Sequence, residues 1–295
     1  MQLFFVKFIP PILLPLFKFI KNKILIYLFQ KKPTYDQKIY YNYNEINEAI
    51  NADSVWESDN WINHVKNSLN LKSQLKLNKY EKTVRKSLQM LSLLNFDHTN
   101  VIDYGGGTGV LIHNLSKFAE DNSFNLEISI IDNKANIVIA QKEYADKKNI
   151  QFYDFKKISS LKFLATNKSD NVGIILNISS VLQYIPKYKS FLKSILEEIN
   201  PNIICITRFI RCENTEHDAY TIQNISTPHG FCGSTIVNLF GKNSLVDTMK
   251  DLNYQILFED YNFKGDASHY FMNCDNKKYR EMTDVSYAFI KKKFN

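Results

Sequence analysis

The sequence predicts an α/β fold built on a doubly wound sheet, and three observations lead to this fold class. A short apolar strand runs directly into a glycine-rich turn at residues 101–109. After that turn, apolar runs typical of strands alternate with segments in which apolar residues recur at helical spacing. No internal repeat interrupts the alternation. Such alternation specifies a largely parallel sheet with helices on both faces.

The helix that precedes the glycine-rich turn is predicted to begin after Asn78. Asn78 followed by Glu81 is typical of a helix N-cap with a carboxylate in the first turn, and Tyr80, Val84 and Leu88 recur on one face. The elements expected next are a strand over 101–104, a helix from Thr108, a strand over 126–131 and a strand over 150–153.

The second half of the chain continues the pattern. Residues 171–178 are mostly apolar, as expected of a strand that is buried on both faces. Pro186 can open a helix, because the missing N–H of proline is tolerated in the first turn. The remaining elements are a strand over 202–208, a helix over 243–252 and an antiparallel pair over 254–261 and 285–291. Together these segments predict a seven-stranded sheet.

Length and composition fit one enzyme domain with an N-terminal extension. The chain has 295 residues, of which 44% are hydrophobic, so it can bury a full core. We expect the catalytic domain over residues 79–295. Residues 33–78 are rich in tyrosine, asparagine and charged side chains, and we interpret them as a small extension that can lid the active site. Residues 1–32 form a separate basic and apolar segment.

The glycine-rich turn has the pattern of a cofactor cradle. A dinucleotide-binding turn with glycines at 105 and 107 would need another at position 110, which is a valine, and no G-K-[ST] follows as a P-loop requires. The observed D-x-G-x-G-x-G resembles motif I of class I S-adenosylmethionine (SAM) methyltransferases. That resemblance implies a Rossmann-like class I fold in which the cofactor lies on the main chain. The cradle residues are Gly105, Gly106, Gly107 and Gly109.

Acidic residues follow three of the predicted strands. Asp103 precedes the first glycine, where a carboxylate can pair with the α-ammonium group of SAM, directly or through water. Asp132 ends the second strand, where its two oxygens can accept hydrogen bonds from both ribose hydroxyls; an aspartate there can also act as an N-cap. Asp154 follows the third strand and is expected either near the adenine amino group or in a solvated loop.

The sequence also resembles a bacterial family of methyltransferases found with genes for surface polysaccharides, capsule and O-antigen. The segments that carry the resemblance are Pro10–Leu13, Asp103–Gly107, Ser179–Ile185, Arg208 and Tyr220–Gln223. It implies SAM as donor and a glycan or lipid-linked sugar as acceptor. The sequence differs from the family pattern at two places. It has Thr207-Arg208-Phe209 where the family tends to have Asp-Arg-Thr, and Asp132 where glutamate is frequent in the family.

This resemblance implies roles for residues near the ends of the fourth and fifth strands. Ser179 would help to bind SAM, and Gln183, Tyr184 and Gln223 would contact the acceptor. Acceptors in this fold meet SAM above the carboxyl ends of these strands, so Arg208 should also face the site. The long segment after the fifth strand holds two histidines, His217 and His229. Each is a candidate general base for a hydroxyl acceptor, and each can equally be a solvated or structural side chain.

The distribution of charge argues against nucleic acid as the substrate. The chain has 37 basic and 30 acidic side chains, and six of the lysines lie in residues 1–32, which contain no acid. The rest of the chain therefore holds 31 basic against 30 acidic side chains, whereas enzymes that act on nucleic acid carry a basic face on the substrate-binding domain. An RNA or other small-molecule methyltransferase, or a SAM-binding protein without catalysis, remain alternative hypotheses.

The N-terminal segment is too interrupted to cross a membrane. Its longest uncharged run, residues 8–17, has ten residues and includes three prolines, and no signal-peptide cleavage site follows. Apolar bulk interleaved with lysine fits an element that lies on an anionic membrane surface, and it also fits a helix packed on protein. We expect a cytoplasmic protein that is peripheral on the inner membrane face.

The cysteines do not indicate a metal site. None of the four is spaced as C-x-x-C, and no paired histidine pattern accompanies them. We therefore expect no metal cofactor and reduced thiols, as is usual in the cytosol.

Overall fold

The structure is a computed structural model of the chain. It describes residues 35–36, 38–49, 55–70, 83–89, 96, 98–157, 161–162, 164, 171–266, 277–279 and 281–292. The predictions for residues 1–32, and for the N-cap at Asn78, lie outside the described residues.

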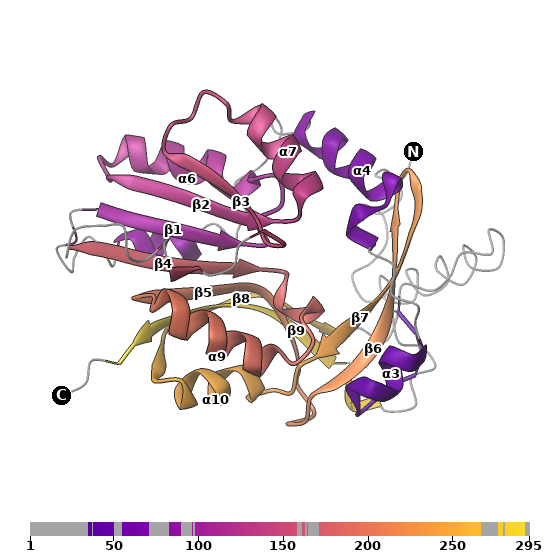
Figure 1. The fold of residues 1–295 in the computed structure, drawn as a ribbon. Helices are drawn as coiled ribbons and strands as arrows, with labels where there is room; N and C mark the ends of the chain where they lie inside the picture. The colour runs from indigo at the N-terminus through magenta and orange to yellow at the C-terminus, as the bar shows by residue number, and fades with distance from the viewer. Residues whose placement is uncertain are drawn as a thin grey trace, which may run out of the picture.

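A seven-stranded mixed sheet forms the centre of the molecule, in the order β3-β2-β1-β4-β5-β9-β8 (Figure 1). The first five strands in this order are parallel, and β9 runs antiparallel to both β5 and β8. The predicted seven-stranded α/β sheet, with its closing antiparallel pair, is therefore confirmed. The strands are β1 (His98–Tyr104), β2 (Leu126–Asp132), β3 (Ile150–Asp154), β4 (Val172–Ser179), β5 (Ile203–Cys212), β8 (Tyr254–Asp266) and β9 (Glu281–Lys291).

Helices cover both faces of this sheet, because alternate residues of the parallel strands face opposite sides. On one face Ile102 and Leu176 share a buried cluster with residues of α9 (Tyr188–Ile199) and α10 (Ser244–Asp251). On the other face Val101 and Ile175 share a cluster with residues of α6, α7 and the helical segment 83–89. The bounds are Val110–Asp121 for α6 and Lys134–Glu143 for α7.

The fifth strand is longer than predicted. It continues to Cys212 and contains an irregularity between Ile206 and Phe209, where its register with β9 shifts. Arg208 lies in this bulge with φ of 55°. A bulge turns the bulged strand away from its neighbours, so the second half of β5 leaves the parallel part of the sheet.

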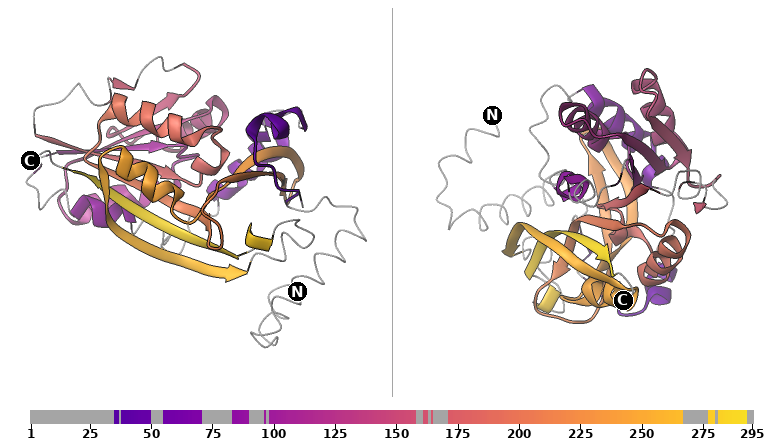
Figure 2. Two further views of the ribbon diagram at one scale, coloured as in Figure 1. Left: turned by 90° about the horizontal axis from the view of Figure 1, so that it is seen from below. Right: turned by 90° about the vertical axis from the view of Figure 1, so that its left-hand side faces the viewer.

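A β-hairpin that the sequence did not predict follows β5. Its strands, β6 (Ala219–Thr227) and β7 (Gly230–Leu239), form a separate two-stranded sheet. Figure 1 shows this hairpin standing across the carboxyl ends of the parallel strands, and Figure 2 shows it from below at the same end of the sheet as the described N-terminal helices. The hairpin therefore faces the edge where the glycine-rich turn lies.

The described part of the N-terminal extension packs on this hairpin. It consists of α3 (Tyr43–Ala49), the short 3-10 helix η2 (Val55–Glu57) and α4 (Asp59–Asn70). Tyr40, just before α3, pairs with Tyr220 of β6, and Asn60 of α4 donates to the carbonyl of Phe231 at 2.9 Å. Within the described ranges, no helix has the length and apolar character needed to cross a membrane.

Candidate functional site

The glycine-rich turn joins β1 to α6 at the carboxyl edge of the sheet. Gly105 donates its N–H to the carbonyl of Ile131 at 2.8 Å, which ties the turn to β2. Gly105 has φ of 71°, and a Cβ there would lie 2.2 Å from Val181. Gly107 also has a positive φ, of 60°, but the space beyond it is open to at least 4 Å. Glycine is therefore required for close packing at 105, whereas at 107 it leaves the main chain accessible to a ligand.

Asp103 lies buried directly beneath this turn. A Cβ on Gly106 would come within 2.4 Å of Asp103 Oδ2, so the glycine allows the main chain to rest on the carboxylate. Asn177 of β4 donates to Asp103 Oδ1 at 2.8 Å. Burial raises the pKa of Asp103 to about 7, and the hydrogen bond from Asn177 only partly offsets it. The Oδ1 atom of Asn177 is itself buried and has no hydrogen-bond partner among the described residues. Two oxygen acceptors thus lie together with few donors, as a bound ammonium group requires.

Asp132 at the end of β2 fastens the turn in place. Its Oδ2 accepts the Gly107 N–H at 2.7 Å, and its Oδ1 accepts the Asn133 N–H at 2.7 Å and the Asn136 side-chain amide at 2.8 Å. Burial raises its pKa, and these three hydrogen bonds act in the opposite direction. A carboxylate has about four acceptor positions, so about one is left for a ribose hydroxyl. Sequence reasoning gave both oxygens to the ribose and missed the role of Asp132 in holding Gly107.

The two remaining residues predicted for the cofactor also lie at this edge. Asp154 pairs in register with Asp132 at the end of β3, and its Oδ1 accepts the N–H of Lys156 at 3.0 Å. That contact is the turn-forming role that the sequence left open as an alternative. Ser179 ends β4, in register with Thr207 of β5. Contact of either residue with the cofactor stays a prediction.

The predicted acceptor residues come together on the β4 and β5 side of the turn. Tyr184, in the 3-10 helix η4 (Leu182–Tyr184), donates its hydroxyl to Gln223 Oε1 of β6 at 3.0 Å. Burial raises the pKa of Tyr184, while hydrogen bonding to Gln183 and Gln223 and the positive charge of Arg208 lower it. Three residues from three segments of the chain therefore act on the phenol group of Tyr184.

Strained backbone conformations occur at this same place. Ser180, directly after β4, has φ of 56°, and Arg208 in the β5 bulge has φ of 55°. The N–H of Ser180 donates to the carbonyl of Thr207 at 3.0 Å, so the two strained residues are close neighbours. Left-handed backbone at residues other than glycine costs free energy and concentrates at functional sites. The Arg208 side chain is exposed there.

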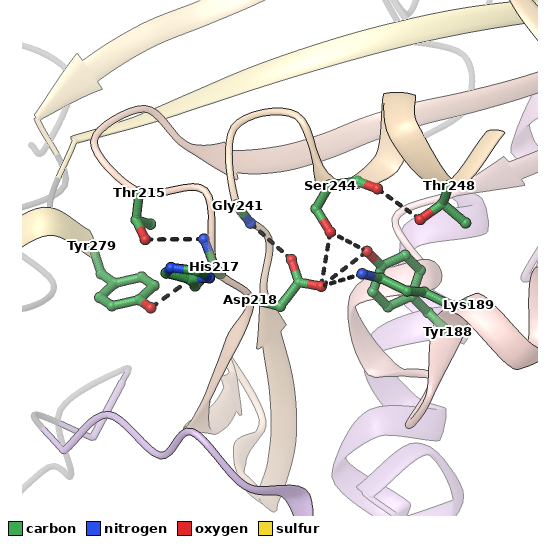
Figure 3. A network of polar contacts seen from close by, with 9 residues as sticks. All are labelled: Tyr188, Lys189, Thr215, His217, Asp218, Gly241, Ser244, Thr248 and Tyr279. Atoms are coloured by element: carbon green, nitrogen blue, oxygen red, sulfur yellow. Dashed lines mark hydrogen bonds and ion pairs between the residues drawn. The ribbon is translucent and has the colours of Figure 1, made fainter. Parts of the chain in front are cut away.

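The two histidines lie at opposite ends of the β6–β7 hairpin. His217 is in the loop before β6, where its N–H donates to Thr215 Oγ1 and its carbonyl accepts from the hydroxyl of Tyr279 (Figure 3). His229 is at the hairpin tip, 2.9 Å from the side-chain amide of Asn67. Strands rise about 3.3 Å per residue, so each end of β6 lies ~13 Å from Gln223 in the middle. The structure does not bring either histidine to the Tyr184–Gln223 pair.

Two further features of the site were not found by sequence reasoning. The sequence identifies Asn177 only as part of a buried strand, because its pairing with Asp103 depends on the register between β1 and β4. Trp56 packs its ring edge-on against Tyr184, with centroids 5.0 Å apart, and Glu57 forms an ion pair with Lys156 at 2.6 Å. No sequence pattern links residues so far apart, although an amide in a buried strand was a signal for Asn177.

These residues fit SAM as the cofactor. The open backbone at Gly107 can accommodate a ligand, and the Asp103–Asn177 pair can receive its ammonium group. Gly109 caps α6 without a side chain, so the amides of the first helical turn can face the carboxylate of the cofactor. The residues described contain no group of three histidine, cysteine or acidic side chains that could hold a metal ion.

Three solved structures are similar to the chain. A SAM-dependent methyltransferase from Clostridium acetobutylicum is 11% identical, with 76% of this chain and 95% of that chain covered and a TM-score of 0.44. The SAM-bound amino pentose methyltransferase CalS10 from Micromonospora echinaspora is 9% identical, with 76% of this chain and 96% of that chain covered and a TM-score of 0.40. The 1,6-didemethyltoxoflavin-N1-methyltransferase from Burkholderia thailandensis with S-adenosylhomocysteine is 9% identical, with 72% of this chain and 80% of that chain covered and a TM-score of 0.40. A search of curated protein sequences found no match.

Family membership rests on the sequence profile. The family described as "Methyltransferase domain" matches residues 95–259, which is more than half of the chain. The match includes the glycine-rich turn, Asp132 and the strands β1 to β5, and it ends within β8. The chain therefore belongs to the methyltransferase domain family, and it is a SAM-dependent methyltransferase with the class I fold.

Proposed function

We propose that the enzyme methylates a hydroxyl oxygen of a sugar, in a surface glycan or its lipid-linked precursor. The observation that carries this proposal is the group formed by Gln183, Tyr184, Arg208 and Gln223 beside the cofactor turn. Its amide, phenol and guanidinium groups offer both donors and acceptors, which a hydroxyl-rich ring requires. Trp56 adds an aromatic ring that contacts Tyr184. Polar groups next to an aromatic surface suit a sugar better than an apolar acceptor.

Positioning accounts for most of the expected catalysis. SAM, when bound, supplies a methyl group that is already activated for transfer. The protein must hold the acceptor oxygen in line with that group and exclude bulk water, and such alignment is a large source of rate enhancement. As the oxygen–carbon bond forms and the sulfur–carbon bond breaks, the hydroxyl proton must pass to a carboxylate or to a water molecule. The Tyr184–Gln223 hydrogen bond and the bulge at Arg208 fix three of the acceptor residues relative to β4 and β5. Arg208 also carries a permanent positive charge, which suits the phosphate of a lipid-linked or nucleotide-linked sugar.

Location at a membrane is a further part of the proposal. The six lysines and the apolar residues of segment 1–32 suit the surface of an anionic inner membrane, where lipid-linked sugars are found. Cell fractionation tests it: the enzyme should be membrane-associated and partly released by high salt, because salt screens the attraction between lysine and lipid. Resistance to both salt and alkaline extraction would contradict a peripheral location.

The acceptor is tested by analysis of surface glycans. Glycans from cells with and without the gene would be compared by mass spectrometry, with a strain that expresses the Tyr184→Phe variant as a third sample. We expect one O-methyl group per repeating unit to be lost without the gene, and to be reduced in the variant because the Gln223 contact is removed. Unchanged glycans, or a product methylated on nitrogen or on RNA, would contradict the proposed acceptor while leaving the SAM-dependent activity intact.

A further inference from the structure

The short helix η2 bridges two distant parts of the sheet edge. Trp56 contacts Tyr184, which follows β4, and the adjacent Glu57 contacts Lys156, which follows β3. In the sheet, β3 and β4 are separated by β2 and β1. A segment that makes both contacts must pass over the carboxyl ends of β1 and β2, where the glycine-rich turn and Asp132 lie.

The hairpin supports η2 and α4 from the outer side. A Cβ on Gly233 of β7 would lie 2.9 Å from Val55, and one on Gly230 would lie 3.0 Å from Asn60. The Asn60 side chain also donates to the carbonyl of Phe231, and the Asn67 side chain contacts His229. Glycines therefore stand where the extension approaches the hairpin most closely. The extension and the hairpin form one unit over the site.

This unit is attached differently on its two sides. On the η4 side, Asn238 of β7 donates to the carbonyl of Ile185 at 2.8 Å, and Gln223 accepts from Tyr184. Both contacts are partly buried. On the β3 side, α4 lies beside α7, and the polar link is the ion pair between Glu57 and Lys156, whose side chains are 45% and 61% exposed. Breaking an exposed ion pair costs little free energy, so the covering unit can separate from the domain on the β3 side.

We propose that η2 is a lid over bound SAM, with Trp56 against the cofactor and the Glu57–Lys156 ion pair as the latch that opens for cofactor exchange. The lid makes the N-terminal extension a part of the cofactor site, which lies otherwise in the methyltransferase domain. The indole nitrogen of Trp61 is buried and has no acceptor among the described residues, although its ring packs on Trp56 at 4.8 Å. A ligand under the lid would supply that acceptor.

Tryptophan fluorescence tests the position of the lid, because Trp56 and Trp61 are the only two tryptophans of the chain. The Trp61→Phe variant leaves Trp56 as the single reporter, and Trp56→Phe leaves Trp61. S-adenosylhomocysteine, the product form of the cofactor, would be titrated into the full chain, with calorimetry as an independent measure of binding. We expect a saturable change in Trp56 emission with the calorimetric Kd. Binding by calorimetry with unchanged Trp56 emission would overturn the lid while leaving the cofactor assignment intact.

Release kinetics test the latch. Glu57→Gln and Lys156→Met should each speed the release of S-adenosylhomocysteine about two- to fivefold in stopped-flow measurements, as expected for one exposed ion pair. The charge-reversed double variant Glu57→Lys with Lys156→Glu should return the rate toward wild type. Lys147→Met is the matched control, since it removes a surface ion pair with Glu120 that does not involve the lid. Equal release rates in wild type, both single variants and the control would overturn the latch.

Discussion

Two carboxylates in this enzyme, Asp103 and Asp218, are surrounded very differently. Asp103 lies under the glycine-rich turn with one side-chain donor, and the amide oxygen beside it has no partner among the described residues. Asp218 lies at the base of the hairpin, where it accepts the N–H of Gly241 at 2.9 Å and the hydroxyls of Ser244 at 2.8 Å and Tyr188 at 3.1 Å (Figure 3). The first carboxylate therefore has one side-chain donor, whereas the second accepts three hydrogen bonds.

The number of hydrogen-bond donors distinguishes Asp103, which is available to a ligand, from Asp218, which stabilises the fold. Asp218 joins β6 to α9 and α10, and Lys189 adds a positive charge 3.4 Å away. A buried carboxylate with too few donors destabilises the folded chain when it is charged, so Asp103 is costly until a cation arrives. The enzyme therefore keeps an unfavourable group at the cofactor turn and a favourable one at the hairpin base.

The largest effect is expected for Asp103→Asn. The variant should lose about a hundredfold in affinity for SAM, because the ammonium group loses its buried counter-charge. It should also be more stable than wild type without ligand at about pH 8. The folded pKa of Asp103 is raised to about 7 from 3.8, so its stability contribution is present at low pH and is lost as pH rises through 7. Calorimetry and thermal unfolding check both parts, and a variant that is less stable yet binds normally would contradict them.

Asp218→Ala should show the opposite pattern. Removing this carboxylate leaves the hydroxyls of Ser244 and Tyr188 and the Gly241 N–H without their acceptor. We expect a loss of about 2–4 kcal/mol in the free energy of unfolding, as for several hydrogen bonds to a charged group. Affinity for SAM should stay within about twofold, since Asp218 contacts α9, α10 and Gly241 and none of its hydrogen bonds described here is to the glycine-rich turn. Denaturant unfolding measures the change in the free energy of unfolding. A large loss of SAM affinity would contradict the separate roles of the two carboxylates.

The pH dependence of SAM binding tests the role of Asp103 separately from that of Asp218. Only the charged form of Asp103 can pair with an ammonium group, and in the free enzyme this form develops around pH 7. SAM affinity should therefore rise about tenfold between about pH 5.5 and about pH 7. Asp103→Asn should show little change over the same range, whereas Asp218→Ala should follow wild type. A flat profile in the wild-type enzyme would place the cofactor ammonium elsewhere.

The smallest effects are expected for the two histidines. His217→Ala and His229→Ala should each keep kcat within about threefold of wild type, because both residues lie beyond the ends of β6, and each end is ~13 Å from Gln223. The measurement is steady-state kinetics with SAM and an identified acceptor. A hundredfold loss in either variant, at unchanged SAM affinity, would restore that histidine as the general base suggested by the sequence.

The cofactor half of the site could be predicted from the sequence because its signals are local. Asp103 and the glycines lie within seven residues, and Asp132 follows a recognisable strand. The parallel topology then brings these strand ends to one edge. Family resemblance predicts that Gln183, Tyr184 and Gln223 contact the acceptor; the three lie together in the structure, and their contact with an acceptor stays a prediction.

The sequence predicts that residues 33–78 can lid the site, but the hairpin and the contacts that hold this extension could not be predicted, because they depend on pairing between distant segments. Val55 meets Gly233, and Glu57 meets Lys156, across about a hundred or more residues of sequence. The hairpin itself lacks a short asparagine–glycine turn, since Thr227 and Gly230 flank a proline and a histidine. Likewise, the shortage of donors around Asp103 appears only when the registers of β1 and β4 are known.

Proton release on cofactor binding tests the central claim most directly, namely that the buried carboxylate under the glycine-rich turn receives the ammonium group of SAM. Calorimetric titrations of the wild-type enzyme with SAM would be run at about pH 6 in two buffers of different ionisation enthalpy. The heats should differ by an amount that corresponds to nearly one proton released per SAM, because Asp103 is mostly protonated before binding and charged afterwards. Equal heats in the two buffers would contradict the account.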